Sequence, residues 1–201
     1  MYRIVLFVLL MWYSASAATA LDYSVHPNTS KRLTAIMAEG DVEPGDSERL
    51  IGFINAQPRR PVIAIYLSSP GGSLYEGMKL GRLFRDWRIK TVVEGGRECA
   101  SACALAFLGG HDERGPWRSS SDNSLLGFHA FRTPGQELQD EGETQKVVAD
   151  VLRYGHQVDA PLELLVLTFA TPSYEMYWLD EVEICALGIK LWSNSSDRFI
   201  C

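Results

Sequence analysis

An alternation of strand and helix patterns between residues 62 and 93 constrains the fold of this chain more than any other feature. Val62 to Leu67 is a continuous apolar run rich in β-branched residues, which is typical of a strand covered on both faces. A Ser-Ser-Pro-Gly-Gly-Ser turn follows, then an amphipathic pattern from Leu74 to Trp87 and a short strand pattern from Lys90 to Val93. This order predicts an α/β fold with parallel strands.

The residues before this alternation fit the same architecture. Leu33 to Met37 predicts an earlier strand, and either Asp46 or Ser47 can cap the helix that follows. The apolar side chains of that helix recur at helical spacing, at Leu50, Ile51, Phe53 and Ile54. With 201 residues and a hydrophobic content of 46%, the chain can bury one core, so we expect a single domain over residues 21–201.

The first twenty residues have the pattern of a targeting segment. Arg3 forms a short basic region, Ile4 to Tyr13 forms an apolar core, and an Ala-x-Ala cleavage sequence follows at Ala15 or at Ala18. We therefore expect a signal peptide over residues 1–20 and an exported protein, periplasmic or secreted. A retained signal segment that anchors the chain is the alternative.

Charge excludes one class of partner. The net charge is −6 and the pI is near 5.2, which argues against a nucleic-acid-binding surface and leaves no polybasic membrane patch. No nucleic-acid partner is expected.

Four cysteines would meet an oxidising compartment after export, where pairing is expected. Cys99 and Cys103 are four residues apart on one face of a predicted helix, and Cys185 and Cys201 lie near the C-terminus. These two pairs are the disulfide candidates. Redox or metal chemistry at Cys99 and Cys103 is an alternative, although thioredoxin-type chemistry needs two intervening residues, and no further zinc ligands stand at a matching spacing. No metal is expected.

The stretch Glu94 to Gly110, EGGRECASACALAFLGG, carries the first candidate for chemistry. Its apolar part, Cys99 to Leu108, predicts a buried helix with Ser101 in the first turn. Free N–H groups and the helix dipole favour a developing negative charge there, and Ala100 and Ala102 leave room around the hydroxyl. A serine that only caps a core helix is the alternative.

The Pro-Gly-Gly turn at residues 70–72 carries the second candidate. Glycines free backbone N–H groups to face a ligand, although a tight turn between a strand and a helix uses the same residues for steric reasons. The turn is not a P-loop, because no Gly-Lys-Ser/Thr sequence closes it.

Three segments, SSPGGSLYEGMKLGRLF, ECASACALAFLGG and LLGFHAFR, resemble in order and spacing the proteolytic subunit of the Clp protease and its exported ClpP-like relatives. The resemblance covers roughly Leu33 to Ile189. It implies a ClpP/crotonase-like fold of repeated β-β-α and βαβ units, with a mostly parallel sheet flanked by helices. It also implies a serine peptidase or hydrolase that needs no cofactor and acts on a peptide or protein substrate.

The resemblance implies roles for four residues. Ser101 matches the nucleophile, and His129 matches the base, which in the family ends a strand after a short hairpin. Gly72 and Ala102 match the two backbone N–H donors of the oxyanion hole. The chemistry agrees, because a serine hydroxyl is a poor nucleophile until a histidine takes its proton, and the oxyanion needs two donors.

The third catalytic residue departs from the family pattern. Counting back from Gly188, the aspartate position falls on Met176, whose thioether cannot orient an imidazolium ring. Glu175 is the neighbouring alternative, and Asp159 and Asp180 are further candidates without support from position. A catalytically impaired module that binds a peptide or partner is therefore the second interpretation of function.

The segment between the histidine and Gly188 differs from ClpP in detail. An acidic loop from Thr133 to Thr144 precedes a predicted helix from Gln145 to Gln157, and Pro161 begins a helix through Phe169. In ClpP this region forms a handle between rings, so the resemblance leaves room for a homo-oligomer. No segment resembles the surface that docks an ATPase, and no ATPase partner is expected.

Overall fold

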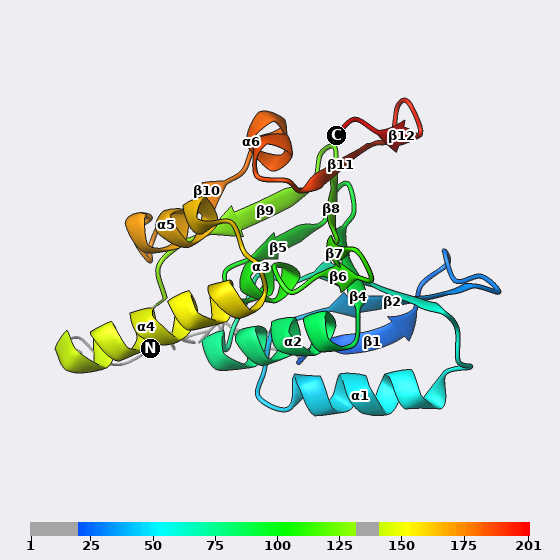
Figure 1. Ribbon diagram of the computed structural model, residues 1–201, viewed down its shortest axis with the longest axis horizontal. Helices are drawn as coiled ribbons and strands as arrows, with labels where there is room; N and C mark the ends of the chain where they lie inside the picture. Colours follow the sequence, from blue (N-terminus) through cyan, green and yellow to red (C-terminus); the bar gives the residue numbers. More distant parts are fainter. Residues whose placement is uncertain (1–19, 132–140) are drawn as a thin grey trace, which may run out of the picture.

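A seven-stranded, mostly parallel sheet forms the centre of the protein (Figure 1). The computed structural model describes residues 20–131 and 141–201. Strands β2, β3, β4, β8 and β11 run parallel, and β1 and β12 pair antiparallel at the two edges. In sheet order the strands are β1 (Asp22–Val25), β2 (Leu33–Glu39), β3 (Val62–Ser68), β4 (Ile89–Val93), β8 (Arg118–Ser121), β11 (Lys190–Ser193) and β12 (Arg198–Phe199).

Six helices accompany the strands in the described residues. They are α1 (Asp46–Ala56), α2 (Leu74–Asp86), α3 (Ala102–Phe107), α4 (Glu141–Gln157), α5 (Leu162–Ala170) and α6 (Glu181–Ala186). Helix α2 packs against α1, α3 and α4, and its buried Leu80 and Phe84 join the core formed with Ile36 and Ile65 of the sheet. The predicted βαβ unit at residues 62–93 is confirmed.

The predicted cap of α1 is wrong. Gly45 occupies the N-cap position and neither side chain caps the helix. The Asp46 carboxylate instead accepts a hydrogen bond from the Glu43 N–H at 2.6 Å, and the Ser47 N–H donates to Glu76 Oε1 of α2 at 2.7 Å. The neighbouring helix therefore satisfies an N–H group that the sequence assigned to a local cap.

A second, three-stranded sheet carries the segments of chemical interest. It contains β5 (Glu98–Ala100), β9 (Leu125–Phe128) and β10 (Tyr177–Trp178), in the order β10-β9-β5. Strands β5 and β9 are parallel, whereas β10 is antiparallel to β9. Because β8 and β9 belong to different sheets, the expected short hairpin before His129 is wrong. A small antiparallel pair, β6 (His111–Asp112) and β7 (Gly115–Pro116), belongs to neither of these sheets, and β6 contacts β4.

The helix predicted from Cys99 to Leu108 is wrong in its first turn. The Ala100 N–H donates to the Ser69 carbonyl at 3.0 Å, and Cys99 pairs with Leu126 of β9. These contacts across the fold hold residues 98–100 as a strand, so tertiary pairing overrides the local apolar pattern. Helix α3 therefore begins only at Ala102.

Other boundaries differ by a few residues. Helix α4 begins at Glu141 rather than at Gln145, so the end of the predicted acidic loop is helical. The rest of that loop, through residue 140, lies outside the described residues, as does the predicted signal peptide except for Ala20. Within residues 20–131 and 141–201, no helix has the length and apolar character needed to cross a membrane.

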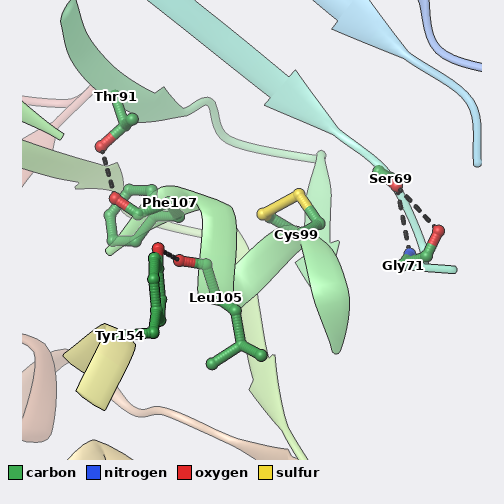
Figure 2. The surroundings of a disulfide bond; sticks show 8 residues. Ser69, Gly71, Thr91, Cys99, Leu105, Phe107 and Tyr154 are labelled. Atoms are coloured by element: carbon green, nitrogen blue, oxygen red, sulfur yellow. Dashed lines mark hydrogen bonds between the residues drawn. A yellow bond between two sulfur atoms is a disulfide. The ribbon is translucent and has the colours of Figure 1, made fainter. Parts of the chain in front are cut away.

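Both predicted disulfides are present. Cys99 is bonded to Cys103 and Cys185 to Cys201, which accounts for all four cysteines. The first bond joins strand β5 to helix α3 and not two positions on one helix face, because Cys99 precedes the helix (Figure 2). Two disulfides are consistent with an oxidising, extracytoplasmic environment.

Candidate active site

Ser101 occupies the sharp turn between β5 and α3. Its backbone angles are φ 56° and ψ −121°, a region that residues with a Cβ rarely adopt. A strained strand-to-helix turn of this kind exposes the nucleophilic serine of α/β-hydrolases. The Ser101 side chain makes no capping hydrogen bond to α3, so the alternative of a serine that only caps the helix does not hold.

Neighbouring backbone and side chains fix the turn at Ser101. The Ser101 N–H donates to the Gly127 carbonyl of β9 at 3.0 Å. Thr91 Oγ1 donates to the Phe107 carbonyl at 2.9 Å and the Tyr154 hydroxyl to the Leu105 carbonyl at 2.5 Å, so two carbonyls of α3 are satisfied (Figure 2). Burial raises the pKa of Tyr154, which keeps the hydroxyl protonated as a donor.

The glycine turn lies directly against Ser101. A Cβ on Gly71 would come within 2.7 Å of Ser101 Cβ, so only glycine allows this approach. Gly72 has φ 138°, and its Cβ would lie 2.3 Å from the Val42 carbonyl oxygen. The Val42 N–H donates to the Gly71 carbonyl, and the Val42 carbonyl accepts from the Ser73 N–H, each at 2.7 Å. Within the described chain the Gly72 N–H, between these two bonds, has no hydrogen-bond partner.

The parallel pairing of β5 and β9 brings Ser101 and His129 to the same edge. Ala100 lies opposite Gly127 in the register, and the serine and histidine follow the carboxyl ends of these neighbouring strands. Both line one pocket of about 470 Å³, together with Gly72 and Ala102. All four residues that the sequence proposed for chemistry therefore meet in a single cavity, which we call the Ser101 pocket.

Apolar side chains form much of the remaining wall of the Ser101 pocket. They come from α2, α3, β9, the residues after it, and α4, and include Leu74, Leu105, Phe128, Phe131, Val147 and Val151. These apolar walls lower the polarity around a carbonyl group placed in this pocket, which strengthens any hydrogen bond that it accepts.

His129 is oriented by a backbone group that the sequence did not reveal. Its Nδ1 atom lies 3.2 Å from the carbonyl oxygen of Ser173. A carbonyl oxygen can only accept, so Nδ1 carries the proton of the neutral ring and Nε2 holds the free lone pair. Every residue has a carbonyl, and no side-chain pattern in the sequence could have marked this one.

Neither Met176 nor the carboxylates considered for the third role orient His129. Glu175 is exposed, and Met176 lies beside Gly127, where a Cβ would be 2.8 Å from its Sδ. The Asp180 carboxylate caps α6 through the Glu183 N–H at 2.8 Å, and Asp159 pairs with Arg85 at 3.4 Å. Among the residues that the structure describes, no carboxylate contacts the histidine ring.

The cysteine pair offers no exposed thiol for redox chemistry. Cys99 and Cys103 are bonded to one another, and both are buried. Within the described residues, no group of three or more histidine, cysteine or acidic side chains could hold a metal ion.

Comparison with known proteins supports the fold. No protein-family model and no curated protein sequence matches the chain. Among solved structures, a serine-to-alanine variant of the 1510-N membrane-bound stomatin-specific protease superposes with a TM-score of 0.57 at 15% identity, covering 81% of this chain and 80% of the other. The described residues thus adopt the mixed α/β fold of ClpP-like proteases, as the resemblance in sequence implied.

Proposed function

We propose that this protein is an exported serine peptidase or hydrolase of the ClpP-like type, acting on a peptide or protein substrate. The observation that carries the proposal is the strained turn that places Ser101 in a pocket shared with His129, Gly72 and Ala102. A turn with these angles is costly to the fold, and such strain persists at sites where the geometry serves the chemistry.

The reaction follows from the roles of these groups. His129 Nε2 takes the hydroxyl proton as Ser101 Oγ attacks the substrate carbonyl carbon, and the N–H groups of Gly72 and Ala102 stabilise the oxyanion. The histidine then gives the proton to the leaving amine, which leaves an ester between Ser101 and the acyl group. Water hydrolyses this ester, with the histidine again acting as base.

Labelling with a fluorophosphonate probe tests this proposal. The mature chain from residue 21 is incubated with the probe beside Ser101→Ala and His129→Ala, and labelling is expected to disappear in both variants. Ser173→Ala is the matched control, because it changes a serine of the same pocket and keeps the backbone carbonyl, so labelling should persist. Labelling of folded Ser101→Ala at the wild-type rate would contradict the assignment of the nucleophile.

Export is the second part of the proposal. The N-terminal targeting pattern and the two disulfides support it. N-terminal sequencing of the secreted or periplasmic protein is expected to begin near Leu21. An intact N-terminus in a membrane fraction would instead favour a retained anchor.

A catalytically impaired binding module is the alternative function. The lack of a carboxylate beside His129 in the described residues favours it, since loss of this acid slows serine hydrolases by orders of magnitude. A folded wild-type protein that binds peptides but never labels would support this alternative.

A further inference from the structure

We propose that the main-chain carbonyl of Ser173 takes the positioning role that an aspartate has in the family, and that Met176 and Trp178 hold it in place by packing against Gly127. This inference rests on the proposed roles of Ser101 and His129. In this view the histidine is still oriented at Nδ1, but by a backbone carbonyl in place of a carboxylate.

The chain that carries the carbonyl is fastened on both sides of His129. After the histidine, the Ala130 N–H donates to the Thr171 carbonyl at 2.9 Å. Before it, Phe128 pairs with Tyr177 of β10. Residues 172–176 therefore cross beside His129 between two points that are hydrogen-bonded to its own strand.

The turn within this crossing leaves one carbonyl free. The Glu175 N–H donates to the Pro172 carbonyl at 3.0 Å, which closes a β-turn with Ser173 and Tyr174 as its central residues. This bond occupies the Pro172 oxygen and not the Ser173 oxygen, which instead meets His129 Nδ1 at 3.2 Å. The turn geometry and the histidine contact therefore use neighbouring carbonyls without competition.

Gly127 makes room for the side chains that support the turn. A Cβ at this position would meet the Trp178 ring at 2.6 Å and Met176 Sδ at 2.8 Å, so both side chains fill the space beside the glycine. The carbonyl of the same glycine accepts the Ser101 N–H at 3.0 Å. One residue of β9 therefore helps to set the position of the serine and of the turn that orients the histidine.

The chemistry of Met176 suits this role. The thioether is apolar and adaptable, so it can fill the irregular space next to Gly127 and hold β10 against β9. Met176 is half-buried and lies with the Trp178 ring against Gly127, where partial burial costs a carboxylate more than it costs a thioether. Met176 is accordingly a positioning residue, which acts on His129 through the backbone turn that precedes it.

A carbonyl and a carboxylate differ in what they do for the histidine. Both accept the Nδ1 proton and so keep Nε2 free to act as base. The carbonyl has a partial charge only, so it stabilises the imidazolium that forms during catalysis less than a carboxylate would. We therefore expect an active enzyme whose acylation is slower than that of an enzyme with a complete triad.

The first test measures the tautomer of His129 and does not depend on activity. Nitrogen-15 NMR of the folded mature protein at a pH where the ring is neutral is expected to show the proton on Nδ1, with its signal shifted by hydrogen bonding. A ring protonated on Nε2 would overturn the inference. If the wild type does not label with fluorophosphonate, the proposed function fails, and this measurement still decides the inference.

The second test weakens the carbonyl itself. An α-hydroxy analogue of tyrosine, incorporated at position 174 by nonsense suppression, converts the amide that carries the Ser173 carbonyl to an ester, whose carbonyl is a poorer acceptor. Tyr174 is 82% exposed and its N–H has no partner among the described residues, so the exchange disturbs little else. We expect kcat and the labelling rate to fall about tenfold with KM unchanged.

Matched controls separate this effect from general damage. Tyrosine inserted at the same codon by the same method keeps the amide and should retain the wild-type rate. Unchanged labelling of the ester protein would overturn the inference. Met176→Leu keeps the bulk of the side chain and should retain both the labelling rate and the Nδ1 tautomer. Met176→Ala should lower the labelling rate and shift the His129 nitrogen signals. Equal behaviour of the two variants would show that Met176 has no positioning role.

Discussion

Two residues in the Ser101 pocket adopt backbone angles that most side chains avoid. Ser101 has φ 56° and Gly72 has φ 138°, and both line the Ser101 pocket. A non-glycine residue in such a region costs about 1–3 kcal/mol, which the surrounding contacts must offset. The turn at Ser101 is therefore held against its own backbone preference by the contacts around it.

Replacing Ser101 should separate stability from function. Ser101→Gly removes the Cβ that makes the turn unfavourable, so we expect the free energy of unfolding to rise by about 1 kcal/mol while labelling is lost. Ser101→Ala keeps a Cβ and should change stability by less than about 0.5 kcal/mol. Urea denaturation of the three proteins checks this, and a destabilised Ser101→Gly protein would show that the turn is not strained.

Gly72 should tolerate no side chain. In Gly72→Ala the new Cβ would lie 2.3 Å from the Val42 oxygen, so the turn must move and the Gly72 N–H with it. We expect a loss of about 1–3 kcal/mol of stability and at least about a tenfold fall in labelling. Gly96→Ala is the matched control, because Gly96 also has positive φ but open space around it; its labelling should be unchanged. Equal effects of the two would contradict a role for Gly72.

Sequence patterns could predict the pocket residues whose type is distinctive, namely the serine, the histidine, a glycine and a small alanine. Ser101, His129, Gly72 and Ala102 stand in recognisable local patterns, and the structure brings them together. The Ser173 carbonyl could not be found in this way, because a backbone oxygen has no identity in the sequence and its direction depends on a turn closed by contacts across the fold.

At the scale of elements, the short second sheet sets the geometry of the pocket. Strands β5 and β9 end beside one another, and β10 pairs along the other edge of β9. These strands have only two to four residues each, and their partners are distant in the sequence. Local periodicity cannot detect such short non-local pairing, so β5 was predicted as helix. The longer β3 and α2 have clear local patterns, a continuous apolar run and a helical period respectively, and were predicted correctly.

The packing between β9 and β10 can be measured by a double-mutant cycle. Gly127→Ala should lower the free energy of unfolding by about 1–3 kcal/mol, because its methyl group would overlap the Trp178 ring. In a Trp178→Ala background the ring is absent, and the same substitution should cost less. Thermal and urea unfolding of the four proteins give the coupling, and strict additivity would show that the two residues do not meet.

Helix α3 depends on a hydroxyl from a distant helix. Tyr154→Phe would remove one donor to the buried Leu105 carbonyl, which would keep its bond from the Leu108 N–H at 3.1 Å. We expect a loss of about 0.5–1.5 kcal/mol in the free energy of unfolding. Tyr23→Phe is a comparison, since that hydroxyl donates to the Asp46 carbonyl from a partly exposed position and its loss should cost less. A larger effect at Tyr23 would contradict the ranking.

At the scale of the whole molecule, the sequence predicted the α/β class and the parallel main sheet but not the division of the strands between two sheets. Strands β8 and β9 are separated by only three residues and join different sheets. Their split depends on which neighbours are available, namely β4 and β11 for β8, and β5 and β10 for β9. This pairing depends on contacts in the assembled fold, and no local sequence pattern indicates it.

The C-terminal disulfide should contribute to the stability of the whole chain. Cys185→Ser with Cys201→Ser removes a crosslink that spans 16 residues and should lower the free energy of unfolding by about 3 kcal/mol. The corresponding double change at Cys99 and Cys103, four residues apart, should cost less, about 2 kcal/mol. Thiol counting in denaturant without reductant should find no free thiol in the wild type, and detection of two would contradict one of the bonds.

The partner of His129 also affects how such a protein would change over evolution. All twenty amino acids carry a carbonyl, so a substitution at position 173 that leaves the turn intact preserves the contact with the imidazole. An aspartate in the same role would be lost by a single codon change. Substitutions at position 173 therefore leave the orientation of the histidine unchanged. A sequence pattern that requires a conserved acid would not detect proteins in which a carbonyl has this role.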